Sequence, residues 1–436
     1  MFMTSFTCGV TDVGLHPLSR TGLSAMSLFT NSQKRLSPRR FSTKLKFFGF
    51  TAATAIALTA CGGEGDGSET IVIGYSGPLS GGAALYGENV QAGLEMAVEE
   101  LNEQGVEIDG TEYSVELRSL DDEYSPATAA TNAQRLVEQD GAPVVVIPHA
   151  GGINAAQEIN TSRSEFLLAA YSSDPRITQQ DNELTMMIPV PFTAYAEPFT
   201  KHFMDDGAET LGLLATASEY GQQWTDMITE TWDENGGEVL SNNNFDYGSV
   251  TDFSTNVSQA IAQDPDVLLV GGPSQPTALV IEEAREQGYE GGFLVMDQAK
   301  IEEMETFTDP ENLHNLLAVN PTREYDEPGT DALVDKFAEK VNDERPINAE
   351  VALNYQALGI IVTAMEVSGS TDDPTAIREA IPEALDQVDD AFRVQEFPSD
   401  VTPEGMSVAG TGHGIYINED GEYENFELDW SVYDNQ

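Results

Sequence analysis

The chain has 436 residues, with 20 basic against 74 acidic residues and a net charge of −54 at pH 7. Residues 1–60 hold seven of the basic residues and one of the acidic ones, which leaves 13 basic and 73 acidic residues, a net charge of −60, in residues 61–436. Such a surface repels nucleic acid and anionic lipid headgroups, so we expect no nucleic-acid partner. The acidic residues are spread along the chain, which favours adaptation to concentrated salt; a cationic ligand is the alternative.

Cysteine and histidine are too few and too scattered for a metal site. The two cysteines are Cys8 and Cys61, and the five histidines show no ligand spacing. We therefore predict no disulfide framework, no thiolate nucleophile, no metal site and no cofactor.

The first sixty residues read as a signal peptide or N-terminal extension. Six basic residues lie within residues 34–46, and the uncharged apolar stretch of residues 47–60 follows them. The end of this stretch and the cysteine after it, Leu58-Thr59-Ala60-Cys61, resemble a bacterial lipobox. We therefore expect cleavage before Cys61 and a lipid on that cysteine. A plain transmembrane anchor is the alternative, but the apolar stretch is short for a membrane span. Residues 61–69 then form a Gly-, Ser- and acid-rich flexible tether.

A strand–loop–helix–strand unit opens the folded part. Ile71–Ile73 is a β-branched run typical of a buried parallel strand, and Ser80-Gly81-Gly82 follows it as a loop. A helix with one apolar face then runs to Gly105, and Tyr113–Arg118 is the second strand. In open α/β sheets such a loop, at the carboxyl end of a strand, is where small ligands bind.

Strand and helix patterns alternate through the rest of the chain, which predicts an α/β fold with parallel sheets covered by helices. The length suits two domains, and Gly414–Tyr423 reads as a hairpin with an Asp420-Gly421 turn. The further predicted strands are Pro143–Pro148, Phe166–Tyr171, Leu211–Ala215, Val267–Val270 and Phe293–Met296.

The opening unit resembles the branched-chain amino-acid-binding family of ABC-transporter solute receptors. The residues that carry the resemblance are Ile73-Gly74-Tyr75-Ser76-Gly77-Pro78-Leu79-Ser80-Gly81, the Tyr86-Gly87 pair, Ala97-Val98-Glu99-Glu100-Leu101-Asn102 and the Asp121-Asp122 turn. The resemblance continues, with gaps, over residues 71–436. A βαβ unit of a Rossmann-like enzyme is the alternative.

The resemblance implies a type I periplasmic-binding fold of two Rossmann-like lobes joined by three crossing segments. The crossings fall near residues 188–191, near Asp297-Gln298 and near residues 411–414. Lobe one is then 70–190 plus 300–412, and lobe two is 191–299 plus 413–436.

The implied function is that of a monomeric, lipid-anchored extracytoplasmic receptor. It would capture a small polar solute, an amino acid of the branched-chain type or similar, by hinge closure and deliver it to the membrane permease of an ABC importer. The alternatives are a receptor of the same fold for an amide, carboxylate or aromatic acid without an ammonium group, and a ligand sensor without a transport role. We expect no enzyme, since no nucleophile elbow or phosphate loop is present.

The family's ligand contacts map onto loops at strand ends. Tyr86 falls where the family places an aromatic residue on the ligand side chain, and the run Tyr171-Ser172-Ser173 falls where it binds the α-amino and carboxylate groups. Gly152 and Asn154, at a helix start, suit a carboxylate. In lobe two, Glu219 and Tyr220 match a motif whose tyrosine closes over the ligand, and Tyr325 is a further aromatic candidate.

One departure concerns the acidic residue that pairs with the ligand's ammonium. The matched position, before Asp252-Phe253-Ser254, carries Val250, which cannot pair with a charge. Either Glu219 or Asp246 takes this role, or the ligand is not an α-amino acid.

Overall fold

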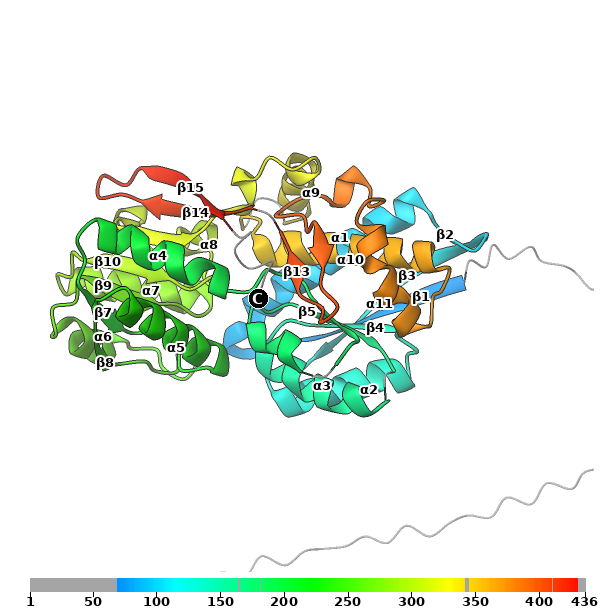
Figure 1. Cartoon of the computed structure of the whole chain (residues 1–436), viewed down its shortest axis with the longest axis horizontal. Coiled ribbons are helices and arrows are strands. Elements are labelled where there is room, and N and C mark those ends of the chain that lie inside the picture. Colours follow the sequence, from blue (N-terminus) through cyan, green and yellow to red (C-terminus); the bar gives the residue numbers. More distant parts are fainter. Residues whose placement is uncertain (1–68, 164, 181, 342–344, 410, 430–436) are drawn as a thin grey trace, which may run out of the picture. The chain divides into compact units, whose positions relative to one another are not determined.

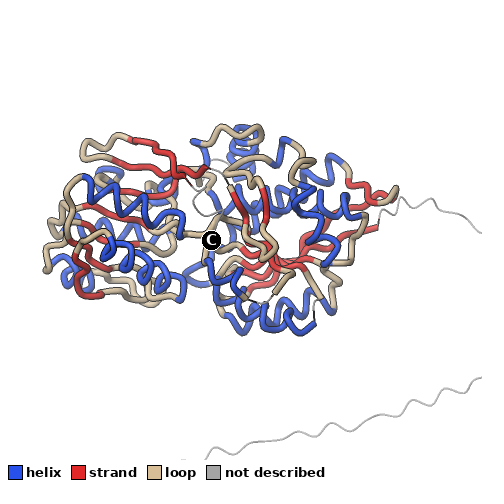
Figure 2. Tube along the Cα trace, in the orientation of Figure 1, coloured by secondary structure: helices blue, strands red, loops and turns tan. Residues whose placement is uncertain are grey.

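The computed structural model describes residues 69–163, 165–180, 182–341, 345–409 and 411–429, which belong to one compact unit. The predicted signal peptide, Cys61 and residues 62–68 of the predicted tether lie outside the described residues. Figure 1 shows two groups of elements, one around each of two large sheets, and Figure 2 shows helices on both sides of these sheets. The α/β fold predicted from the sequence is confirmed.

The first sheet has six strands in the order β2-β3-β1-β4-β5-β6, all parallel except the β2–β3 hairpin. Together with the helices that pack on it, this sheet forms what we call the first lobe. Its elements are β1 (Glu69–Gly77), α1 (Ala84–Gln104), β2 (Val106–Ile108), β3 (Thr111–Asp121), α2 (Pro126–Glu138), β4 (Val144–Ile147), α3 (Ala150–Arg163), β5 (Leu167–Ala170), β6 (Thr185–Met187), α9 (Thr330–Val341), α10 (Ala349–Ser368), α11 (Pro374–Ala384), β12 (Asp400–Val401) and β13 (Ser407–Val408).

The second sheet has seven strands in the order β15-β14-β11-β10-β9-β7-β8, and its elements form the second lobe. These are α4 (Thr193–Asp205), β7 (Thr210–Leu213), α5 (Glu219–Glu234), β8 (Glu238–Asn242), α6 (Ser254–Ile261), β9 (Val267–Val270), α7 (Ser274–Glu286), β10 (Gly292–Val295), α8 (Ile301–Met304), β11 (Leu316–Val319), β14 (Thr411–Ile417) and β15 (Tyr423–Asp429). The hairpin predicted at the tail is confirmed, because β14 and β15 pair as antiparallel neighbours.

The crossing predicted near Asp297-Gln298 is wrong. Strand β11 pairs with β10 and β14, so the chain stays in the second sheet through Val319. Ile301 and Met304 of α8 also pack in the core of the second lobe. The predicted strands omit β11, β6 and β8. Strand β6 has only three residues and β8 is polar at three of its five positions, whereas β11 is an apolar run of four residues like β9, and the same pattern identifies it.

Helix α10 forms the centre of the first lobe's core. It is apolar on all sides, and it is the one helix of the described residues that is long and apolar enough to cross a membrane. Its burial gives another reason for that composition, because 78% of its most apolar window lies inside the protein.

Helices α1 and α10 approach each other closely at Gly93. A Cβ atom at this position would lie 2.3 Å from the carbonyl oxygen of Val351, well inside van der Waals contact. Gly87 is confined in the same way, since a Cβ there would lie 1.8 Å from the carbonyl oxygen of Pro78. Gly87 and Gly93 are therefore required by backbone packing on the two sides of α1.

The outer edge of the first sheet is covered by a late segment of the chain. The Met187 N–H of edge strand β6 donates to the carbonyl oxygen of Gly405 (2.7 Å), and Ser407 Oγ donates to the Met187 carbonyl oxygen (2.5 Å). The buried Arg378 guanidinium of α11 donates to the Thr185 carbonyl oxygen (3.0 Å). Main-chain groups of β6 are thus satisfied from outside the sheet.

We predict that Gly93→Ala destabilises the protein by about 1–3 kcal/mol, because the added methyl group overpacks the α1–α10 contact. Alanine normally stabilises a helix relative to glycine, so the sign of the change is informative. Urea unfolding in concentrated salt measures it. Gly82→Ala is the control, since the nearest atom to a Cβ there is 3.9 Å away; equal stabilities for the two variants would contradict the prediction.

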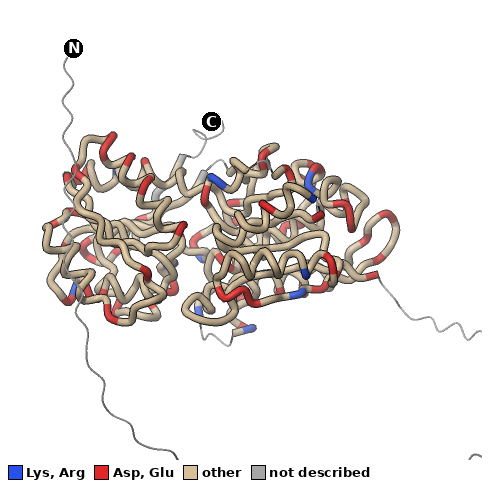
Figure 3. Tube along the Cα trace, turned by 90° about the horizontal axis from the view of Figure 1, so that it is seen from below, with Lys and Arg blue, Asp and Glu red and all other residues tan. Residues whose placement is uncertain are grey.

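Acidic residues are distributed along the chain in both lobes, and lysines and arginines are sparse (Figure 3). This distribution predicts repulsion over the whole surface rather than at one patch. We expect the midpoint of thermal unfolding to rise between dilute buffer and molar salt, because salt screens exposed charges over a few ångströms. A midpoint that stays constant across that range would exclude adaptation to salt.

Candidate functional site

A cavity of about 60 Å³ lies where loops of the two lobes meet. The loops after β4, β5 and β10 contribute to it, together with the starts of α1, α3, α5 and α10. The lining residues are Tyr86, Tyr124, Pro148, His149, Ala150, Tyr171, Ser172, Ser173, Pro189, Val190, Tyr195, Tyr220, Asp297, Gln298, Lys300, Val319, Tyr325, Ala349, Leu353, Gln395 and Glu396. Six residues predicted from the sequence are therefore brought together: Tyr86, Tyr171, Ser172, Ser173, Tyr220 and Tyr325.

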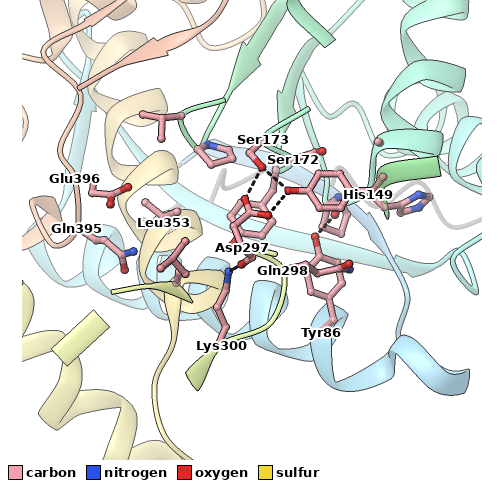
Figure 4. Close-up of a pocket in the computed structure, with 18 of the residues that line it drawn as sticks. Tyr86, His149, Ser172, Ser173, Asp297, Gln298, Lys300, Leu353, Gln395 and Glu396 are labelled. Carbon is pink, nitrogen blue, oxygen red and sulfur yellow. Dashed lines mark hydrogen bonds between the residues drawn. The ribbon is translucent and has the colours of Figure 1, made fainter. Parts of the chain in front are cut away.

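The Asp297 carboxylate joins the two lobes. Ser173 Oγ of the first lobe donates to Asp297 Oδ2 (2.5 Å), and the Tyr220 hydroxyl of the second lobe donates to Asp297 Oδ1. Figure 4 shows Ser173 directed toward the Asp297 carboxylate, with Lys300 Nζ on the main-chain carbonyl oxygen of Asp297. A carboxylate held by hydroxyls in this way keeps further acceptor positions for a cationic group.

Tyr220 is positioned by the start of α5. Ser218 caps this helix by accepting the Gly221 N–H (3.0 Å), which fixes the first turn. Phe192 meets the Tyr220 ring edge-on with centroids 5.7 Å apart. Burial, and then the Asp297 carboxylate, raise the pKa of the Tyr220 hydroxyl well above its usual range, so the group stays protonated and donates.

Tyr86 and Tyr171 form the wall on the first-lobe side. Their ring centroids are 6.3 Å apart, and the Tyr86 hydroxyl donates to the Pro148 carbonyl oxygen. Burial raises the pKa of both hydroxyls well above the usual range. Both rings are therefore neutral surfaces of fixed orientation.

The start of α3 borders the cavity at His149 and Ala150. His149 is almost fully buried, with Nε2 3.1 Å from Asp122 Oδ2 and Nδ1 accepting the Gly152 N–H (3.0 Å). This pairing places the imidazole proton on Nε2. The N–H groups at the start of a helix attract anions, so this end of the cavity suits a carboxylate.

Three predicted site residues do not line the cavity. The Gly152 N–H is already bound to His149, and a Cβ at Gly152 would lie 2.5 Å from that ring, so this glycine serves packing. Glu219 has a side chain that is 51% exposed and faces Arg176 (3.4 Å) and Asn154 Nδ2 (3.4 Å). Asn154 and Glu219 thus form a polar contact between the lobes outside the cavity.

The position of Val250 lies away from the cavity. Val250 and Asp246 lie on a separate open groove, where Asp246 Oδ1 accepts the Gly248 N–H (2.9 Å). Neither Glu219 nor Asp246 lines the cavity, whereas the carboxylate of Asp297 does. Asp297 follows the predicted strand Phe293–Met296, so the rule that placed Ser173 after β5 identifies it too. Sequence reasoning likewise passed over Lys300, Tyr195 and Glu396, which carry no local motif.

A model of the family described as periplasmic binding protein matches residues 70–411. The chain belongs to this family. The resemblance seen in the sequence is confirmed. A curated relative, the leucine-, isoleucine-, valine-, threonine- and alanine-binding protein of Pseudomonas aeruginosa, is 23% identical over 392 residues, which cover 87% of this chain and 94% of the relative.

Solved structures of periplasmic binding proteins share the fold. The branched-chain amino acid transporter substrate-binding protein LivJ from Streptococcus pneumoniae, in complex with isoleucine, matches with a TM-score of 0.68 and 21% identity, covering 82% of this chain and 100% of that one. A solute-binding protein of an ABC transporter from R. palustris, in complex with benzoate, matches with a TM-score of 0.69 and 15% identity. The match covers 82% of this chain and 96% of that one. The predicted type I periplasmic-binding fold is confirmed.

Beside the cavity of this periplasmic binding protein, two buried glutamates from different lobes share the same partners. Asn89 Nδ2 donates to Glu303 Oε1 (2.5 Å) and Glu350 Oε2 (2.9 Å), and Asn348 Nδ2 donates to the same two oxygens (2.8 and 2.6 Å). Glu303 belongs to α8 of the second lobe, and the other three residues belong to the first. Burial, and then the Glu303 charge, raise the pKa of the Glu350 carboxyl well above its usual range.

We predict that this cluster makes stability fall with rising pH. The folded protein retains the Glu350 proton from about pH 4.5 to about pH 8, where the unfolded chain has lost it, so the free energy of unfolding declines across that window. Glu350→Gln should reduce the decline, measured by urea unfolding at a series of pH values. Glu290→Gln is the control, because that side chain is 81% exposed. An unchanged pH slope in the Glu350 variant would contradict the prediction.

Proposed function

We propose that this protein is the extracytoplasmic solute-binding receptor of an ABC importer and that it captures an amino acid in the cavity between its lobes. The observation that carries the proposal is the Asp297 carboxylate inside the cavity, opposite the start of α3. An α-amino acid has an ammonium and a carboxylate on one carbon. It would place the ammonium on Asp297 and the carboxylate at the Ala150 end, with Ser172 and Ser173 between them.

The neutral tyrosines would hold the rest of the solute. Tyr86 and Tyr171 offer ring faces from the first lobe, Tyr220 closes from the second, and Tyr325 lines the same cavity. Because groups from both lobes contact the solute, the solute binds the closed arrangement more tightly than the open one. Binding therefore shifts the population toward the closed form by a hinge motion.

The relatives named as binding proteins support a role without catalysis. Among the described residues, no group of three or more metal-ligating side chains is positioned to hold a metal ion. We propose that the receptor acts as a monomer, passes its solute to a membrane permease and is held at the membrane by a lipid on Cys61. Retention of radiolabelled lipid by the wild-type chain, and its loss in Cys61→Ala, is the measurement for the anchor.

The test of the function is a binding screen in concentrated salt. Thermal shift with amino acids, amides and carboxylates should identify a ligand that raises the unfolding temperature by mass action. Calorimetry then gives its affinity, and small-angle scattering should show compaction. A screen in which carboxylates without an ammonium bind as tightly as the matching amino acids would favour the alternative class of solute.

We predict that Asp297→Asn weakens binding of the amino acid roughly 10- to 100-fold, because an ammonium in the closed cavity loses its anionic partner. The same amino acid and its analogue without the α-amino group are compared by calorimetry. The wild-type preference for the amino acid should disappear in the variant.

The matched control is Glu290→Gln, which removes a carboxylate that is 81% exposed and lies outside the cavity, and it should leave affinity unchanged. If Asp297→Asn keeps the full preference for the amino acid, Asp297 is not the ammonium site.

A further inference from the structure

Glu396 is a second carboxyl group that lines the cavity, and the arrangement described above gives it no role. It lies in the loop between α11 and β12, with a backbone φ of 46°. This left-handed conformation is unfavourable for a residue with a long side chain, and such strain is concentrated at functional sites in proteins. Glycine would adopt this conformation without strain. The chain has a glutamate at this position instead, which points to a use for its carboxyl group.

Protein donors hold the Glu396 carboxyl from one side. The Tyr325 hydroxyl donates to Oε1, and the His413 backbone N–H also faces the carboxyl. Tyr325 is itself buried and meets the His413 ring edge-on at 5.5 Å. A carboxylate has about four acceptor positions, so two donors leave capacity for a group inside the cavity.

Glu396 and the start of α3 lie at different ends of the site. In Figure 4, Glu396 and Gln395 lie on one side of Asp297, and Tyr86 and His149 lie on the other. An amino acid with its carboxylate at the α3 end and its α-ammonium on Asp297 would therefore direct its side chain toward Glu396. The groups at that end are Gln395, Tyr325 and Glu396 beside Leu353, which is not the lining that a purely aliphatic side chain requires.

The charges of the cavity point to a second cationic group. Its acidic side chains are Asp297 and Glu396, and its basic one is Lys300, whose ammonium is bound to the Asp297 carbonyl oxygen. Burial raises the pKa of Glu396 to about 7; Lys300 and the two donors oppose this effect, and Asp297 adds to it. A cationic group beside Glu396 would offset the cost of its burial. The surrounding tyrosine rings also attract cations through their faces.

We propose that Glu396 determines the specificity of the cavity, and that the solute is an amino acid whose side chain ends in an ammonium group bound by Glu396. This inference rests on the proposed function, in which Asp297 binds the α-ammonium. The inferred solute therefore has a basic side chain and not an aliphatic one of the branched-chain type.

The experiment compares pairs of amino acids that differ at the end of the side chain. Affinities of lysine and norleucine, and of ornithine and norvaline, are measured by calorimetry in concentrated salt for the wild type, Glu396→Gln and Glu396→Gly. In the wild type, the basic member of a pair should bind at least tenfold more tightly. Both variants should lose this preference and keep the binding of norleucine and norvaline within about threefold.

The glycine variant guards against misfolding, since glycine adopts the backbone conformation of position 396 without strain. The wild-type preference should also increase from pH 6 to pH 8 as Glu396 ionises, and this pH dependence should vanish in Glu396→Gln. The groups that face Glu396, namely Tyr325, Lys300, Asp297 and the His413 main chain, are intact in that variant.

The outcomes separate this inference from the function on which it rests. If leucine or norleucine binds more tightly than any basic amino acid, the assignment of Glu396 is wrong while the receptor function stands. If amides or hydroxyl amino acids are preferred, the group at Glu396 is a neutral donor and the ammonium is excluded. If no amino acid of any class binds, the proposed function itself fails.

Discussion

The arrangement of the cavity depends on one carboxylate, that of Asp297, which accepts hydroxyl hydrogen bonds from both lobes. Ser173 approaches from the end of β5 in the first sheet, and Tyr220 approaches from the start of α5 beside the second. The carboxyl ends of parallel strands lie at the same edge of a sheet, and the loops that follow them lie there too. Where two such edges face each other, these loops form the walls of the cavity between them. The hydrogen bonds to Asp297 fix the distance between those loops.

Charge inside the protein is arranged differently from charge on its surface. On the surface, carboxylates are numerous and ion pairs such as Arg118–Glu116 and Lys201–Glu197 are exposed, so their individual contributions are small. Inside, each of the carboxyls at the lobe interface is held by named donors: hydroxyls for Asp297, amides for Glu303 and Glu350, a phenol for Glu396. A buried carboxylate is tolerated only with such partners, which explains why a chain this acidic keeps few acids in its interior.

Much of the fold could be predicted from the sequence, because buried parallel strands such as Val267–Val270 are uninterrupted apolar runs. The same pattern located Ser173 and Tyr171 at a strand end. What could not be predicted depends on contacts between distant segments. Strand β11 is an apolar run like Val267–Val270, but only its pairing with β10 and β14 reveals that it belongs to the second sheet. The sequence suggested that the Gly152 N–H could bind an anion. In the structure that N–H donates to the His149 ring, which Asp122 holds in place. Glu396 comes to the cavity from a loop that no motif marks.

The cover on strand β6 has a consequence for biosynthesis. An unpaired strand edge is a template for pairing with another chain, and here the residues that cap it include Ser407, which follows Met187 by 220 positions. When the chain emerges N-terminus first, every strand of the first sheet emerges long before the residues that cap its edge. The second lobe, inserted between the two, has to emerge in the meantime. Until residues 402–408 have emerged, the edge of β6 is open to pairing with other chains. The length of the second lobe therefore sets the time during which aggregation competes with folding.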